Sequence, residues 1–361
     1  MSTASLDRIV LKGFRSIREA DIALKPINLL IGANGAGKSN FLSFFKFARE
    51  LQRKNLQFHV QTNGGVQKFL HFGGKRTPAM ECLVEFSGGK YSARLSAGAG
   101  NRLYFADERW TVLGGEQRGD ELEFVSPPGA GESLLPATYG TEYGREISVE
   151  IDSWRVYHFH DTSPEARVKA TGRVDQTDSL RADASNLAAF LRSIRATVEY
   201  RLIVLTIRRV APYFVDFVLE PEGEGDKYIN LRWTHAGSDD IFDAADFSDG
   251  TLRFICLATL LLQPEPPKVV VLDEPELGLH PFALTILAGI IRSISVRTQI
   301  IAATQSVTLA NQFDYEDIVV VDRSDEATTL RRVTLADVEP WFGQDYGIGD
   351  LWEKNIIGGT P

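Results

Sequence analysis

The spacing of apolar residues predicts a strand, a glycine-rich loop and a helix at the start of the chain. Residues 6–14 alternate apolar and polar positions, which is typical of a half-buried strand. Residues 26–31 form a short apolar run that ends in glycines, which favours a buried strand. Residues 39–52 then carry apolar side chains at helical spacing along one side.

The middle of the chain predicts a β-rich stretch followed by helices. Residues 80–151 contain alternating segments and Gly-Gly turn signals, and residues 145–151 are expected to be one of the strands. Residues 118–140 are rich in glycine and proline, which predicts a surface loop. Residues 183–210 have a helical pattern that Pro212 ends. Further strands are expected at residues 214–219 and 229–234.

The last third of the chain alternates buried strands with helices. A polar turn precedes the first helix, and a proline-rich stretch follows it. The expected order is helix 252–262, strand 269–272, helix 282–293, strand 298–304 and strand 318–322. Apolar strands that alternate with helices predict an α/β protein whose sheet is covered on both faces.

Composition narrows the classes of protein that fit. The 361 residues carry a formal net charge of −9, so nucleic-acid binding would need a local basic face. No apolar run approaches the ~20 residues of a membrane helix, and the first residues lack the order of a signal segment. Cys82 and Cys256 lie in apolar contexts, which predicts buried free thiols and a reducing cytoplasm.

A phosphate-binding loop is the strongest chemical signal in the sequence. Residues 32–39 match the pattern G-x-x-x-x-G-K-[ST] in full. The glycines let backbone N–H groups point at phosphate oxygens, and the next helix presents its positive N-terminus to the same anion. Lys38 adds a charge for the β- and γ-phosphates of ATP, and Ser39 a hydroxyl ligand for Mg²⁺. The predicted nucleotide-binding residues of this loop are Asn34, Gly35, Ala36, Gly37, Lys38, Ser39 and Asn40.

Two carboxylates follow the buried strand at residues 269–272. Asp273 is placed to join the Mg²⁺ shell, and Glu274 to polarise an attacking water. The two ends of the chain therefore predict halves of one nucleotide-binding domain, residues 1–79 and 236–361. Residues 80–235 are the predicted inserted lobe of strands and helices.

These motifs resemble those of ABC-type ATPases. The FSDGT run at residues 247–251 stands where ABC ATPases carry their signature motif. The runs EPELGLHP at 274–281, GKSN at 37–40 and LKGFRSI at 11–17 resemble the SMC, RecF and OLD groups. DLWEKNIIGG at 350–359 resembles the ending of a bacterial family of stand-alone AAA-type ATPases that lack a nuclease domain. The resemblance implies an ABC-type P-loop domain split by the inserted lobe.

The same resemblance implies a homodimer that forms around ATP. Ser248 and Gly250 of one copy would bind the γ-phosphate held by the loop of the other. Asp249 stands where ABC transporters have glycine, so it either weakens closure or turns outward. Gln305 occupies the place of the switch histidine, which predicts slow turnover. It either orients a water or γ-phosphate as a catalytic residue, or caps a strand end.

Four further residues are candidates with competing interpretations. Gln67 is the candidate Mg²⁺ ligand that senses the lobe, with Gln61 as its alternative. Arg15 is either a nucleotide contact or a solvated arginine at a strand end. His280 either contacts the second copy or begins a helix as a polar residue.

Two functional hypotheses remain after the motifs are combined. In the first, the protein is an ATPase switch that signals to DNA or a protein effector, in DNA repair or antiviral defence. In the second, it is a slow or inactive ATPase scaffold that holds a separately encoded effector such as a nuclease. The inserted lobe disfavours a transporter ATPase.

Two ways of acting on DNA directly are weaker. A built-in nuclease that uses Asp322 and Asp325 is disfavoured, because fewer than forty residues follow them. Arginines of the predicted middle helices could face DNA, although acidic neighbours favour a solvated face. These are Arg181, Arg192, Arg195, Arg201, Arg208 and Arg209.

Overall fold

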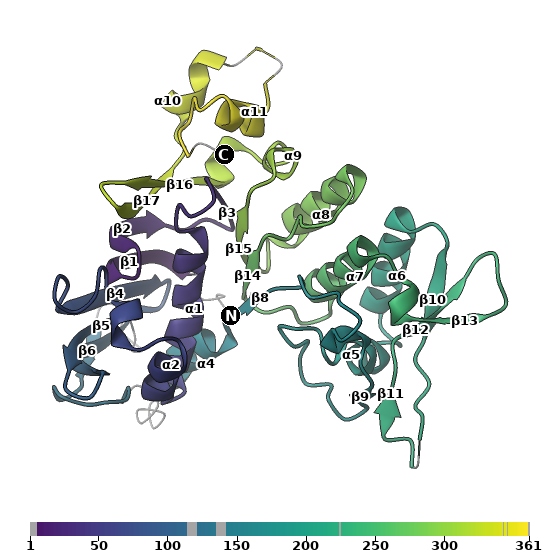
Figure 1. Ribbon diagram of the computed structural model, residues 1–361, viewed down its shortest axis with the longest axis horizontal. Helices are drawn as coiled ribbons and strands as arrows, with labels where there is room; N and C mark the ends of the chain where they lie inside the picture. Colours follow the sequence, from purple (N-terminus) through teal and green to yellow (C-terminus); the bar gives the residue numbers. More distant parts are fainter. Residues whose placement is uncertain are drawn as a thin grey trace. The chain divides into compact units, whose positions relative to one another are not determined.

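The chain forms two compact units, which are described separately (Figure 1). The computed structural model describes residues 6–113, 121–134, 142–223, 225–341, 343–344 and 346–359. Unit 1 comprises Met1–Val156, Lys268–Val271 and Gln299–Pro361, and unit 2 comprises Tyr157–Pro267 and Leu272–Thr298. Residues 80–235, the predicted lobe, are shared between the two units. The division into functional domains stays a prediction, since compactness does not say which residues bind a ligand.

An antiparallel sheet forms one side of unit 1. Its strand order is β2-β1-β4-β5-β6-β7. The strands are β1 (Leu6–Phe14), β2 (Ile17–Ala23), β4 (Ala79–Phe86), β5 (Gly89–Gly98), β6 (Arg102–Leu113) and β7 (Glu121–Val125). Burial alternates along β1 and β4, so one face of this sheet packs on the core and the other is polar.

The second sheet carries the glycine loop. Its order is β17-β16-β3-β15-β14-β8, and β3 pairs in parallel with both β15 and β16. All five residues of β3 are buried, as expected for a central strand. The strands are β3 (Ile27–Ile31), β8 (Arg155–Tyr157), β14 (Val269–Asp273), β15 (Gln299–Thr304), β16 (Ile318–Ser324) and β17 (Ala327–Arg332).

An aromatic core joins the helices of unit 1 to its sheets. Phe14 of β1 packs edge-on against Phe44, with ring centroids 6.0 Å apart, and Phe45 packs against Trp154 at 5.2 Å. Both partners Phe44 and Phe45 lie on α1, which runs beside this core (Figure 1). The helices are α1 (Lys38–Gln52), α2 (Leu56–Thr62), α3 (Val66–Phe69), α4 (Glu142–Ser153), α9 (Val307–Ala310), α10 (Leu335–Val338) and α11 (Ile348–Glu353).

Two predictions for the middle of the chain are wrong. Residues 145–151 form part of helix α4, because Ile147 and Ile151 have the i, i+4 spacing of a helix although, with Val149, they also fit strand alternation. Burial settles the matter, since Ile151 is buried whereas Val149 is exposed. The predicted loop at 118–140 contains strand β7, and residues 118–120 and 135–140 lie outside the described part.

Unit 2 is built around helix α7 (Asp249–Leu262). Every residue from Thr251 to Leu262 except Arg253 is buried, so α7 is surrounded by other elements. The predicted helix at 183–210 is two helices, because Thr197 begins a new one by accepting a hydrogen bond from the Tyr200 N–H. The other elements are α5 (Leu187–Ser193), α6 (Val198–Val210), α8 (Pro281–Ile294), β9 (Gly172–Arg173), β10 (Phe214–Val218), β11 (Tyr228–Ile229), β12 (Arg232–His235) and β13 (Ile241–Asp243).

Cys82 and Cys256 are buried free thiols, as predicted, and burial raises the pKa of each to about 12. Among the described residues, no helix is long and apolar enough to cross a membrane.

A buried carboxylate ties the segment after β7 to the sheet, and its removal should destabilise unit 1. Glu108 accepts hydrogen bonds from the hydroxyls of Tyr91, Ser126 and Ser133 and from the Leu134 N–H. Glu108→Ala should therefore lower the free energy of unfolding by at least about 2 kcal/mol, because these donors lose their acceptor. Chemical denaturation measures the loss. The exposed Glu123→Ala is the control and should cost no more than about 1 kcal/mol; equal losses would contradict the role of Glu108.

Candidate functional site

The glycine loop lies between β3 and α1 and leaves little room for side chains. A Cβ atom on Gly32 would overlap the Val321 carbonyl oxygen, and one on Gly37 would overlap Thr328 Oγ1. Gly37 also has a φ of 113°, which L side chains rarely adopt. Gly35, with a φ of 77°, faces open space. The loop therefore needs glycine at 32 and 37 for close packing, and at 35 for backbone conformation.

The loop presents hydrogen-bond donors at the start of α1. No side chain caps this helix at Gly37, and backbone N–H groups at the start of a helix favour an anion. Lys38 is buried and donates to the carbonyls of Gly32 at 2.5 Å and Ala33 at 3.0 Å. Asn34 and Ser39 are exposed, and Ala36 is buried. This arrangement suits an anion with several oxygens.

A network of polar side chains, which sequence analysis did not predict, contacts the glycine loop. Thr328 on β17 donates to the Ala36 carbonyl at 2.7 Å and shares a 2.7 Å hydrogen bond with Ser16. Asn40 donates its amide to the Ser16 hydroxyl, also at 2.7 Å. These contacts give Asn40 a supporting place beside the loop, and its predicted contact with a nucleotide stays a prediction.

Arg15 is held in a half-buried position with a positive φ of 53°. Its N–H donates to the Phe69 carbonyl at 2.8 Å, and its guanidinium lies 5.0 Å from the centre of the Phe69 ring. Burial lowers the pKa of this guanidinium. Within the described ranges it forms no ion pair, and its Nε has no hydrogen-bond partner. A charge in this situation favours an anionic ligand over a purely solvated role.

The two candidate glutamines lie on neighbouring short helices. Gln61 is exposed near the end of α2. Gln67 lies on α3 and accepts a 2.8 Å hydrogen bond from the Gly74 N–H, which fixes its side-chain oxygen. The choice between them as a metal ligand therefore stays open.

Gln305 directly follows β15, next to the strand that leads into the loop. Thr304 is the register partner of Ile31, so the two strands end level with each other. Gln305 is the first residue after β15 and Gly32 is the first residue after β3, so the two residues lie at the same level of the sheet. The next residue, Ser306, caps α9 by accepting from the Leu309 N–H. Unit 1 therefore brings the loop and Gln305 to the same edge of the sheet.

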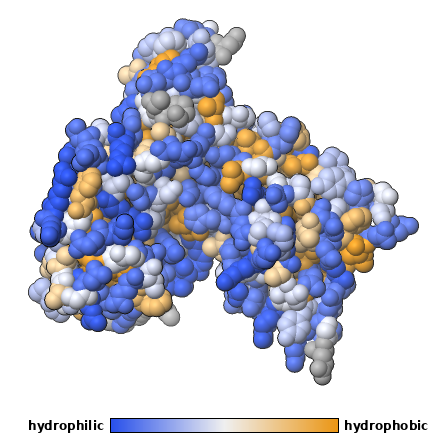
Figure 2. Space-filling model, viewed as in Figure 1, coloured by the Kyte–Doolittle hydropathy of each residue, from blue (hydrophilic) through white to orange (hydrophobic). Residues whose placement is uncertain are grey.

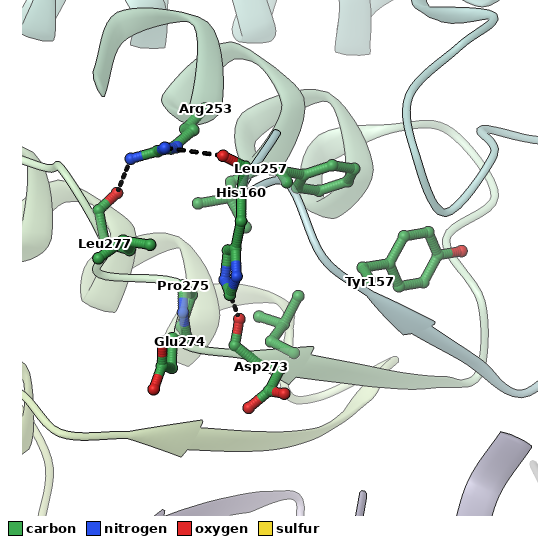
Figure 3. A pocket seen from close by; sticks show the side chains of 10 residues that line it. Tyr157, His160, Arg253, Leu257, Asp273, Glu274, Pro275 and Leu277 are labelled. Carbon is green, nitrogen blue, oxygen red and sulfur yellow. Dashed lines mark hydrogen bonds between the residues drawn. The ribbon is translucent and has the colours of Figure 1, made fainter. Parts of the chain in front are cut away.

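Asp273 and Glu274 lie at the end of β14, in unit 2 (Figure 3). His158 Nδ1 lies 3.7 Å from Asp273 Oδ2, an ion pair when the imidazole is protonated. His160 Nε2 is 2.9 Å from the Asp273 carbonyl. Glu274 has a φ of 46°, an uncommon conformation for a non-glycine residue. Figure 3 shows both carboxylates pointing away from Arg253.

Arg253 connects three segments around a small pocket beside these carboxylates. It donates to the carbonyls of Leu277 at 3.1 Å and His160 at 2.8 Å (Figure 3). The pocket holds about 10 Å³, roughly the space of one water. At the same place the start of α7 meets the loop after Glu274, because a Cβ on Gly250 would overlap the Gly278 carbonyl. The histidines and Arg253 were missed by sequence analysis, since no local motif marks them.

The predicted signature residues begin α7. Ser248 is exposed and caps the helix by accepting from the Thr251 N–H at 3.2 Å. Asp249 is also exposed, in the first helical turn, where a carboxylate is favourable to the helix dipole. His280 is exposed and caps α8 by accepting from the Phe282 N–H. Its cap geometry fits the helix-start interpretation.

Asp322 and Asp325, the carboxylates considered for a nuclease, have structural roles. Asp322 accepts hydrogen bonds from the N–H groups of Arg323 and Gly359. Asp325 has a φ of 48° in the tight turn between β16 and β17. In the ranges that the structure describes, no group of three or more His, Cys, Asp or Glu side chains is placed to hold a metal ion.

The arginines considered for DNA are only partly available. Arg195 pairs with Glu220 at 3.1 Å, and Arg208 donates to the Val215 carbonyl at 2.8 Å. Arg181, Arg192, Arg201 and Arg209 are exposed.

The two loop glycines offer a matched test of the packing under the loop. Gly35→Ala should cost about 1 kcal/mol of unfolding free energy, because only the left-handed backbone is strained. Gly37→Ala should cost a further ~1–3 kcal/mol, because it must also displace the buried Thr328. Thermal and chemical unfolding measure both. Adding Thr328→Ala to Gly37→Ala should recover part of the loss; no recovery would mean that the packing is not tight there.

Comparisons with known proteins agree with this geometry. The profile of a family described as "AAA domain, putative AbiEii toxin, Type IV TA system" matches residues 131–311, half of the chain. A second AAA-domain profile matches residues 8–126. RecF, the DNA replication and repair protein, is 54% identical over 39 residues in Salmonella typhi and Edwardsiella ictaluri. That match spans 10% of this chain and 11% of each RecF.

Solved structures show the same fold over nearly the whole chain. An SMC head bound to the C-winged helix domain of ScpA has a TM-score of 0.62 at 16% identity, covering 93% of this chain and 99% of that one. The SMC head of Pyrococcus furiosus, bound to the C-terminal domain of ScpA, has a TM-score of 0.60 at 15% identity and covers 94% and 98%. The chain therefore belongs to the family described as AAA domain, putative AbiEii toxin, Type IV TA system, and it is a P-loop ATPase with the fold of SMC heads.

Proposed function

We propose that this ATPase is a molecular switch in which two copies close around ATP and Mg²⁺ and reopen after hydrolysis. The observation that carries the proposal is the glycine loop at the start of α1, where the helix has no side-chain cap and the buried Lys38 lies beside the carbonyls of Gly32 and Ala33. The exposed Ser39 hydroxyl fits the same ligand, because a hydroxyl of this loop can bind the metal ion. Arg15, half-buried without an ion pair among the described residues, would add a second positive charge.

Each of the other candidate residues would have a separate role in ATP hydrolysis. Ser39 and Asp273 would hold Mg²⁺, with Gln67 or Gln61 as a further oxygen ligand, and the ion would neutralise charge on the phosphates. Glu274 would accept a proton from the attacking water. Gln305 would orient that water without taking a proton, because an amide does not titrate. A histidine at this position could take up a proton, so the glutamine supports slow ATP turnover.

The signature residues would act on the nucleotide of the opposite copy. Ser248 is exposed at the N-terminus of α7, a 14-residue helix whose first N–H groups favour an anion. Leu277, which lines a pocket with Glu274, and Phe282 at the start of α8 are each about half exposed, and Figure 2 shows apolar residues gathered over α8. Exposed apolar residues around a polar site are typical of a surface that meets another protein. Asp249 has room to turn outward, so it need not oppose closure.

One observation favours the scaffold hypothesis as a second candidate function. Helix α6 exposes Val198, Leu202 and Leu205, which are 68%, 49% and 56% exposed and share one side of the helix. Apolar side chains among arginines suit a protein surface better than a phosphate backbone, which favours a protein effector over DNA. SMC heads of the same fold bind ScpA domains, which are separate proteins. Steady-state ATP turnover separates the two hypotheses, since an inert wild type supports the scaffold.

Glu274→Gln should keep ATP binding and slow hydrolysis by on the order of 10²-fold or more, because the general base is lost. It should also trap the closed dimer, which light scattering with ATP would detect. Glu265→Gln, an exposed carboxylate before β14, is the matched control and should behave as wild type. Turnover of Glu274→Gln equal to an active wild type would mean that Glu274 is not the base.

Ser248→Arg should bind ATP as a monomer but fail to dimerise, because its own loop is intact while a bulky side chain fills the partner's phosphate site. Ser248→Asn keeps a helix cap and is the control for lost capping. Lys38→Ala should instead lose tight ATP binding.

Mixing the Ser248→Arg and Lys38→Ala proteins tests the trans arrangement. A mixed dimer pairs one intact loop with one intact signature, so about half of the sites can form and turnover should reappear. Light scattering and ATPase rates on the mixture report it. Normal dimerisation and turnover of Ser248→Arg alone would rule out the trans site.

A further inference from the structure

The DLWEKNIIGG motif lies in a segment that contacts the glycine loop. Residues 347–359, here called the tail segment, comprise helix α11 and the turn after it, and they belong to unit 1. Leu351, Trp352 and Ile357 are buried, so the segment is part of the folded core. Its two ends reach different places on the edge of the sheet that carries β3 and β15.

The far end of the tail segment packs on the first residue of the loop. A Cβ on Gly359 would lie 3.6 Å from Gly32 Cα and 3.6 Å from the Ile31 carbonyl oxygen. It would also lie 2.8 Å from Val320 Cγ1, closer than real side chains approach. The backbone of Val321 and that of Gly359 therefore both lie close to Gly32.

Gly359 is fixed through both of its backbone polar groups. Its N–H donates to Asp322 Oδ2 at 3.3 Å, and its carbonyl accepts the indole N–H of the fully buried Trp352. Arg331 donates to the neighbouring Ile357 carbonyl at 3.0 Å. The side chains of Asp322, Trp352 and Arg331 thus fix the position of this turn against the loop.

The near end of the tail segment holds the residues that follow Gln305. Asn311, at the end of α9, accepts the N–H groups of Gly349 at 2.7 Å and Asp350 at 3.3 Å, and donates to the Asp350 carboxylate at 3.1 Å. A Cβ on Gly349 would overlap the Val307 carbonyl oxygen. Because Gln305 and Ser306 lead directly into α9, this contact limits where Gln305 can move.

We propose that the tail segment is a positioning element of the nucleotide site, holding the glycine loop with one end and the Gln305 segment with the other. The register of β15 on β3 brings both targets to the same sheet edge, so one rigid piece can set the spacing between them. Gly359, Trp352 and Asn311 are positioning residues that act through Gly32 and α9. The proposal rests on the proposed ATP site.

Two adjacent glycines provide the first test. Gly358 and Gly359 have φ values of 78° and 70°, so alanine strains both backbones equally. A Cβ on Gly358 lies 3.8 Å from Val320 Cγ1, an ordinary contact, whereas one on Gly359 is too close. Gly359→Ala should raise the Kd for ATP about tenfold, equivalent to ~1.4 kcal/mol, while Gly358→Ala stays near wild type. Calorimetry at equal folded fraction measures both.

A second pair of variants separates positioning from general stability. Trp352→Phe keeps most of the buried volume but loses the hydrogen bond to Gly359, so it should also raise the Kd. Asn311→Ala should instead lower kcat by about tenfold with a smaller change in Kd, because it releases Gln305 and not the loop. The exposed Lys354→Ala is the control and should change neither.

The outcomes distinguish this inference from the proposed function. If wild type binds ATP and Lys38→Ala does not, but Gly359→Ala and Trp352→Phe both bind as wild type, the tail segment does not position the loop. Equal effects of all tail variants on Kd and kcat, in proportion to lost stability, would also overturn the proposal. If wild type itself fails to bind ATP, the proposed function is wrong. In a wild type that binds but does not hydrolyse, the Kd results alone decide.

Discussion

The close packing of β16 and β17 against the glycine loop is the constraint on which the candidate site depends. Gly32 and Gly37 lie where any side chain would overlap Val321 or Thr328, so β16 and β17 fill the space that side chains would otherwise take. This packing holds the loop open toward solvent without a side-chain cap on α1. Polar groups beneath it are hydrogen-bonded through Thr328, Ser16 and Asn40.

The distribution of charged side chains also favours binding of an anion at the loop. The chain as a whole is acidic, yet Lys38 and Arg15 carry positive charge near the loop, Lys38 beside the carbonyls of Gly32 and Ala33 and Arg15 over the Phe69 ring. A cation that has already lost part of its hydration gains more from a phosphate than one in full solvent does. Elsewhere, the exposed sheet of unit 1 pairs its cations with acids, as Arg8 does with Asp21 and Lys12 with Glu19. On that face of the sheet, these cations are balanced by neighbouring acids.

Local pattern predicted the elements whose signal is continuous along the chain. The strand at 6–14, the helix after the loop and the buried strand before Asp273 agree with the structure. It failed at 145–151, where a five-residue apolar pattern fits two periods. It also could not find Thr328 beneath Gly37 or Gly359 beside Gly32. Ser16 and Thr328 are 312 positions apart, and no local pattern encodes such a contact.

The site residues that sequence analysis missed share a physical role. Thr328, Ser16, His160 and Arg253 all bond to backbone atoms or to each other, so they hold the predicted residues in place. Motif spacing reflects what a ligand requires, and a phosphate requires the same loop in many folds. The supporting groups depend on the particular packing around that loop, and this packing differs from one fold to the next. A motif therefore predicts the chemistry of such a site, whereas its geometry has to come from the three-dimensional structure.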